Sequence, residues 1–126
     1  MTLAEVNSRF VYKTDTNQYG RVEHWATLSE VGDKLVGDCE SYALHLKKYV
    51  PEFKDYDLYH CKLGGEGHCI LSNGFIMIDN NTQRRLALYK YMEDYKVTDL
   101  RKYWKIEVLW KVWTTKLLGF VPFIRS

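Results

Sequence analysis

The feature that most constrains this chain is a predicted helix that begins with a thiol. Apolar side chains recur at helical spacing after the segment Gly37-Asp38-Cys39-Glu40, at Tyr42, Ala43, Leu46, Tyr49 and Val50. Asp38 is a favourable N-cap, because its carboxylate can accept the free backbone N–H groups of the first turn. A proline at position 51 then ends the run. The pattern predicts a helix over residues 39–50 that packs along one face.

Cys39 lies in the first turn of that helix and on its apolar stripe. The partial positive charge of a helix N-terminus lowers the pKa of a thiol and favours the nucleophilic thiolate. The flanking acids Asp38 and Glu40 act in the opposite direction, because a negative neighbour disfavours a second anion. Cys39 is therefore a candidate nucleophile. The alternative is a small buried hydrophobic residue, which is the common role of a free cysteine.

A hairpin is predicted at Asn73-Gly74, which separates two apolar runs. Asn-Gly in this position is typical of a two-residue type I′ turn. Pairing outward from that turn places Leu71 opposite Ile76 and His68 opposite Asp79. Directly opposed side chains have Cβ atoms about 4.5–5.5 Å apart. The register thus predicts an imidazole beside a carboxylate, with an ordinary cross-strand ion pair as the alternative interpretation.

The rest of the pattern predicts a mixed fold. Thr27 and Glu30 form a capping box that predicts a short helix ending at Gly37. An aromatic-rich strand is expected over 56–62, and alternation of apolar side chains predicts another over 106–112. We expect one α+β domain, residues 1–126, in which the helix that carries Cys39 packs on an antiparallel sheet. We expect it to cover the sheet face that carries His68, Ile70 and Met77.

Composition limits the classes of partner. The chain has 126 residues, 46% of them hydrophobic, and a net charge of +2, which predicts a folded globule and no nucleic-acid partner. Its start is too polar for a secretory leader, and the apolar run 117–124 is too short to span a bilayer. We expect a cytoplasmic protein with reduced thiols and no membrane partner. The apolar C-terminal segment is expected to cover the core, with a docking patch for a partner or for a membrane surface as the alternative.

Together these residues predict a Cys-His-Asp system. His68 would take the proton of Cys39, Asp79 would orient the imidazole, and the thiolate would attack the carbonyl of a peptide or amide. The Cys39 N–H could stabilise the oxyanion; candidates for a second donor are Trp25, Asn17 and Gln18. The chemistry requires no cofactor. A zinc site is disfavoured, because adjacent cysteine and histidine residues on a strand point to opposite faces.

The same segments carry a family resemblance. Trp25-Ala26-Thr27, the stretch from Gly37 to Ala43, Gly67-His68 and Ile78-Asp79-Asn80 resemble the motifs of bacterial transglutaminase-like cysteine peptidases. The resemblance implies a papain-like fold with Cys39 as nucleophile, His68 as base and Asp79 as orienting acid. In some members the acids beside the nucleophile hold calcium, which implies Asp38 and Glu40 as its ligands here. A compact chain without a leader would suit a phage or mobile-element protein.

Two other functions fit the same residues. An acyl transferase would use the same thioester chemistry with a different acceptor, and the sequence does not reveal the acceptor pocket. A catalytically silent module of the same fold would instead bind a partner through its aromatic surface.

Overall fold

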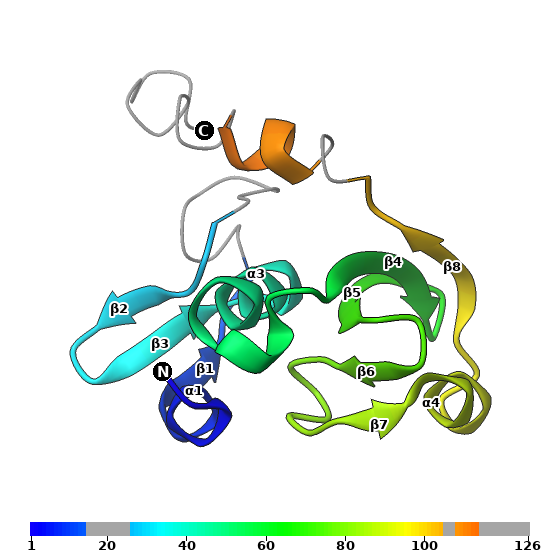
Figure 1. The fold of residues 1–126 in the computed structure, drawn as a ribbon, viewed down its shortest axis with the longest axis horizontal. Coiled ribbons are helices and arrows are strands. Elements are labelled where there is room, and N and C mark those ends of the chain that lie inside the picture. Colours follow the sequence, from blue (N-terminus) through cyan, green and yellow to red (C-terminus); the bar gives the residue numbers. More distant parts are fainter. Residues whose placement is uncertain (15–25, 105–107, 114–126) are drawn as a thin grey trace.

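The computed structural model describes residues 1–14, 26–104 and 108–113 of the chain (Figure 1). Its elements are α1 (Leu3–Arg9), β1 (Phe10–Tyr12), β2 (Ser29–Val31), β3 (Lys34–Gly37), α3 (Cys39–Tyr49), the 3-10 helix η1 (Pro51–Phe53), β4 (Asp57–Leu63), β5 (Glu66–Ser72), β6 (Ile76–Ile78), β7 (Leu86–Ala87), α4 (Leu88–Asp94) and β8 (Thr98–Lys102). Residues 108–113 form a further helical segment. The predicted α+β class is confirmed.

The strands form two sheets. The first has the order β1-β3-β2, with β1 parallel and β2 antiparallel to β3. The second is antiparallel throughout, with the order β7-β6-β5-β4-β8. Helix α3 lies between the two sheets (Figure 1). One hydrophobic core contains buried residues of both sheets and of α3, so this helix joins them.

The predicted helix at Cys39 is confirmed within one residue of its expected end. The carboxylate of Asp38 accepts a hydrogen bond from the Ser41 N–H at 3.0 Å, which satisfies one of the free donors of the first turn. The buried stripe of the helix, which includes Tyr42, Ala43 and Leu46, belongs to the same core as the strand residues Leu58, Cys69 and Leu71. An antiparallel sheet therefore holds the helix that carries the thiol, as expected.

The helix predicted to end at Gly37 is wrong, because β2 and β3 form a hairpin there. Val31 pairs with Lys34, and Gly32 adopts a φ of 62° in the two-residue loop between them. Glycine takes this left-handed conformation without the steric cost that a Cβ would add. The same glycine would weaken a helix interior by about 1 kcal/mol. Pairing of β3 with β1 on its other edge completes the sheet, which local capping signals could not reveal.

The hairpin between β5 and β6 is present, but its predicted register is wrong. Leu71 pairs with Ile78 and Ser72 with Met77, so the pairing is displaced by two residues from the expected one. The reason is local: the Asn73 Oδ1 accepts hydrogen bonds from the backbone N–H groups of Phe75 and Ile76. This side chain replaces a backbone acceptor, which is a known role of asparagine in turns. A displacement of two residues keeps every side chain on its predicted face.

Helix α3 packs on the opposite sheet face from the one we expected. Cys69, Leu71 and Ile78 point towards α3, whereas Ile70 and Met77 belong to a second core beside Tyr91 of α4. His68 is paired with Cys61, which also lies in this second core, so the histidine stands on the α4 face. The prediction failed because the apolar residues of β5 occupy both faces. A strand buried on both sides does not show which face a given helix covers.

The strand predicted over 106–112 is also wrong where the structure describes it. Residues 108–113 are helical, and Val108 and Val112, one turn apart, pack against the main core. Alternating apolar residues suggest a strand, but valines four residues apart also fit one helix face.

Among the described residues, no helix is long and apolar enough to cross a lipid bilayer.

We predict that Gly37→Ala destabilises the fold. A Cβ at this position would lie 2.8 Å from the Leu28 Cδ2 and 2.8 Å from the Ser41 Cβ, so the start of α3 would have to move. We expect a loss of about 1–3 kcal/mol in the free energy of unfolding, measured by urea denaturation. Gly67→Ala is the matched control, because its Cβ would meet only the His60 side chain, at 3.3 Å. Equal stability of both variants would contradict this packing argument.

Candidate active site

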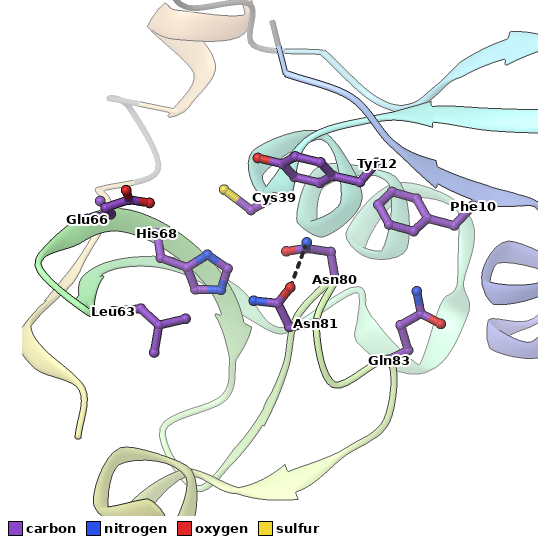
Figure 2. Close-up of a pocket in the computed structure, with 10 residues that line it drawn as sticks. Phe10, Tyr12, Cys39, Leu63, Glu66, His68, Asn80, Asn81 and Gln83 are labelled. Atoms are coloured by element: carbon purple, nitrogen blue, oxygen red, sulfur yellow. Dashed lines mark hydrogen bonds between the residues drawn. The ribbon is translucent and has the colours of Figure 1, made fainter. Parts of the chain in front are cut away.

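The site lies at an edge of β5 that β6 leaves open. Strand β6 pairs with β5 at Leu71 and Ser72, and beyond this point the chain turns away through Asn80 and Asn81. A cavity of about 500 Å³ lies at this edge. It is lined by Phe10, Tyr12, Cys39, Leu63, Glu66, Gly67, His68, Asn80, Asn81 and Gln83 (Figure 2). The structure therefore brings two of the predicted triad residues, Cys39 and His68, to one cavity.

His68 and Asp79 form the buried pair that the sequence predicted. The His68 Nε2 lies 2.7 Å from the Asp79 Oδ2, and the two side chains are 9% and 0% exposed. The two residues do not face each other directly, because of the register displacement. They meet as diagonal neighbours on one face, which side chains of this length can do. An ionised carboxylate only accepts hydrogen bonds, so the Nε2 carries a proton and the Nδ1 of a neutral ring is an acceptor.

Asp79 is held by three further donors. Its Oδ2 also accepts a hydrogen bond from the Tyr91 hydroxyl at 2.8 Å, and its Oδ1 accepts from the backbone N–H groups of Asn81 and Thr82 at 3.1 and 2.7 Å. Burial by itself would raise the pKa of Asp79. The hydrogen bonds from His68, Thr82 and Tyr91 outweigh burial and lower that pKa below its ordinary value. The carboxylate is therefore ionised at neutral pH.

The thiol of Cys39 donates its hydrogen bond to Glu40. Its Sγ lies 3.2 Å from the Glu40 Oε2, while the sulfur and the His68 ring border the same hollow (Figure 2). The sequence predicts that His68 takes the proton of this thiol, which requires a direct contact between the sulfur and the imidazole. Because a thiol has one proton to donate, the contact with Glu40 and a contact with His68 are alternatives, and the structure shows the first.

Burial and the neighbouring acids both disfavour ionisation of the Cys39 thiol. Burial, followed by the negative charges of Glu40 and Asp38, raises the pKa of the Cys39 thiol well above its ordinary value. Burial and the charge of Asp38 also raise the pKa of Glu40 to about 7. In this arrangement the thiol is protonated at neutral pH. A general base is then needed to produce the thiolate.

One backbone donor acts in the opposite direction. The N–H of Cys69, on the open edge of β5, favours the thiolate of Cys39 and so lowers the thiol pKa in part. Together with the N–H of Cys39 at the start of α3, it forms a candidate pair of oxyanion donors. The donors proposed from the sequence, Trp25, Asn17 and Gln18, lie outside the described residues.

The acids proposed as calcium ligands have other partners. Asp38 caps α3, and Glu40 accepts from the thiol. Calcium takes six to eight oxygen ligands in most protein sites. Within the described ranges, no group of three Asp, Glu, His or Cys side chains is placed to hold a metal ion. Calcium binding at Asp38 and Glu40 stays a prediction of the resemblance.

Sequence reasoning missed several residues of the site. Tyr91 was not predicted as a site residue, yet its hydroxyl donates a hydrogen bond to Asp79 from the middle of α4. Leu88 and Tyr91, three residues apart and both buried, carry the helical spacing that could have revealed its orientation. The amides of Asn80 and Asn81 also reach the cavity and are joined to each other at 3.3 Å (Figure 2). No local sequence pattern predicts that these two amides reach the cavity, because their position depends on the path of the chain after the end of β6.

Comparison of the chain with protein-family models and with curated proteins found no match.

We predict that Cys39 is alkylated before Cys61 and Cys69 in the folded protein. Cys39 is partly exposed, whereas the other two thiols are buried. Its raised pKa should make labelling slow at neutral pH, and Glu40→Gln should accelerate it by removing a negative neighbour. Iodoacetamide labelling followed by peptide mass spectrometry measures both effects, with the urea-unfolded chain as the control. Equal labelling of all three thiols in the folded state would contradict the assignment.

We predict that Glu40 makes stability fall as pH rises. Its folded pKa of about 7 lies above the ordinary value of 4.5, so the folded state binds the extra proton. Its contribution to stability is complete below pH 4.5 and is lost as pH rises through 7. Urea denaturation of wild type and Glu40→Gln across this range should show the fall in wild type and a smaller one in the variant. Parallel curves would show that Glu40 does not titrate in this window.

Proposed function

We propose that the protein is a thiol hydrolase, a cysteine peptidase or amidase that works through a thioester acyl-enzyme. The observation that supports this most is the buried His68–Asp79 pair, whose histidine lines the same cavity as the thiol of Cys39. A histidine oriented by a carboxylate and placed near a helix-terminal thiol is the arrangement that activates a cysteine nucleophile. The chemistry requires no cofactor.

The tautomer of His68 determines how the proton moves. Because the Nε2 donates to Asp79, the Nδ1 is the atom that accepts the thiol proton. The thiolate then attacks the carbonyl carbon of an amide, and the N–H groups of Cys39 and Cys69 stabilise the oxyanion. The imidazolium returns the proton to the leaving amine, which leaves a thioester on Cys39. Water, deprotonated by His68, hydrolyses the thioester and restores the thiol.

Glu40 makes the resting enzyme inactive in this scheme. Its contact with the thiol must break before the sulfur can transfer its proton to His68. A substrate carbonyl that enters the cavity would approach the sulfur and the oxyanion donors together, and rotation of the Cys39 side chain would complete the nucleophile–base contact. Catalytic hydrogen bonds that form only with substrate bound are common in enzymes.

The cavity suits a peptide or protein substrate. Aromatic rings of Phe10 and Tyr12 stand beside the amides of Asn81 and Gln83, which supplies apolar contact and hydrogen-bonding groups together. We propose a papain-like, transglutaminase-like arrangement for the fold and the cytoplasm as the compartment.

A second candidate function is a catalytically silent module that binds a peptide in the same cavity. The hydrogen bond from the Cys39 thiol to Glu40 supports this alternative, because it occupies the proton that a catalytic thiol would give to His68.

We predict that Asp79→Asn lowers turnover by about 10²–10⁴-fold, because an amide no longer holds His68 in the productive tautomer. Hydrolysis of a mixed fluorogenic peptide library, normalised to folded protein by circular dichroism, measures this loss. Cys39→Ala should abolish turnover and thioester formation, the latter detected by mass spectrometry after trapping. Cys61→Ala is the matched control. This thiol lies in the second core, so its replacement should leave turnover unchanged.

The outcomes separate the two candidates. Turnover that survives Cys39→Ala would overturn the nucleophile assignment. Peptide binding by wild type and Cys39→Ala alike, with hydrolysis by neither, would establish the silent module in its place.

A further inference from the structure

A second surface of the molecule carries large apolar side chains that the core does not use. In the helical segment 108–113, Val108 and Val112 pack inward. Leu109, Trp110 and Trp113 point outward, and they are 69%, 63% and 54% exposed. The two indole rings lie together, with their centroids 5.4 Å apart. The segment is therefore apolar on two faces, and the outward face carries side chains that are more than half exposed.

An apolar groove lies beside this segment. Its volume is about 380 Å³, and its lining consists of Ala26, Thr27, Leu44, Lys47, Lys48, Lys54, Val108, Leu109 and Val112. We call it the lysine groove. The side chains of Lys48 and Lys54 are exposed at its border. The groove thus combines an apolar floor with ammonium groups at the surface.

The charge of the chain is unevenly distributed along the sequence. Residues 100–126 contain six Lys or Arg and one Glu, whereas residues 1–99 contain twelve Lys or Arg and fifteen Asp or Glu. A basic, tryptophan-rich segment on an otherwise acidic chain is typical of proteins that associate with anionic surfaces. Tryptophan is enriched at the boundary between lipid headgroups and acyl chains, because its ring is apolar and its N–H is polar.

We propose that this surface, formed by Leu109, Trp110, Trp113 and the lysine groove, binds the surface of an anionic lipid bilayer. The exposed indoles and Leu109 would enter the headgroup region, and Lys48 and Lys54 would contact lipid phosphates. A second copy of the chain fits less well, because a two-fold contact would place the same lysines against each other. The lysine groove and the cavity of Cys39 share no lining residue, so this proposal is independent of the proposed function.

The proposal departs from our sequence-based expectation that a membrane would not be a partner. The sequence also left a membrane surface as an alternative partner of the apolar run 117–124, which lies outside the described residues. An interfacial surface needs neither the length nor the continuous hydrophobicity of a spanning helix.

Vesicle binding tests the proposal. Full-length protein is mixed with vesicles of phosphatidylcholine alone or with phosphatidylglycerol added, and the bound fraction is measured by flotation. We expect binding to the anionic vesicles and a blue shift of tryptophan fluorescence. Lys48→Glu with Lys54→Glu should lower the partition coefficient by more than about tenfold, and added salt should weaken binding of wild type. Trp110→Ser with Trp113→Ser should also lower the partition coefficient.

Tyr89→Ser is the matched control, because this ring is 74% exposed on α4 and outside the lysine groove. Circular dichroism confirms that each variant is folded. Equal binding to neutral and anionic vesicles, no binding to either, or full binding by the tryptophan variant would overturn the proposal. A dimer in light scattering that the tryptophan variant abolishes, without vesicle binding, would assign the surface to a second copy instead.

Discussion

The carboxylate of Asp79 is the interaction on which the site depends. It lies at the end of β6, is 1% exposed, and accepts hydrogen bonds from β5, from α4 and from the turn that follows it. A buried charge is tolerated only when it is paired and hydrogen-bonded, so each of these elements is fixed relative to the others. His68 then has one permitted orientation, with its Nε2 towards Asp79. The tautomer of His68 follows from this carboxylate, which also links α4 to the edge of the cavity.

The thiol is controlled by opposing influences that meet at the start of α3. The helix terminus and the Cys69 N–H favour the thiolate, whereas burial, Glu40 and Asp38 favour the protonated form, and the second group prevails. Asp38 caps the helix through its carboxylate, so the group that stabilises the first turn also places a negative charge near the thiol. Glu40 is different, because the N-cap hydrogen bond to the Ser41 N–H comes from Asp38. Its hydrogen bond to the sulfur is the part of the site that a single substitution can remove while the helix keeps its cap.

The sequence was most informative where local chemistry decided the structure. Asp38 and Pro51 set the limits of α3, and the apolar run before Asn73 identified β5. It failed where pairing between distant segments decided the structure. The β2–β3 hairpin pairs with β1, which lies earlier in the chain, and no local sequence pattern indicates that pairing. The register error is instructive. The Asn73 side chain displaced the pairing by two residues, yet His68 and Asp79 still met, since an even displacement preserves the face. Tyr91 could not be assigned to the site, because only the tertiary fold brings α4 beneath β5.

Helix α3 connects the two surfaces that carry our proposals. Cys39 stands in its first turn, and Lys47 and Lys48 stand in its last, where positive charge also stabilises the helix dipole. Eleven residues of helix span about 16 Å. A bilayer bound at the lysine groove would therefore lie about one helix length from the thiol, and the cavity would remain open to solvent. If both proposals hold, that spacing would favour substrates that lie close to a membrane surface and reach the cavity from the aqueous side. Attachment would then restrict which peptides meet the cavity without altering the chemistry inside it.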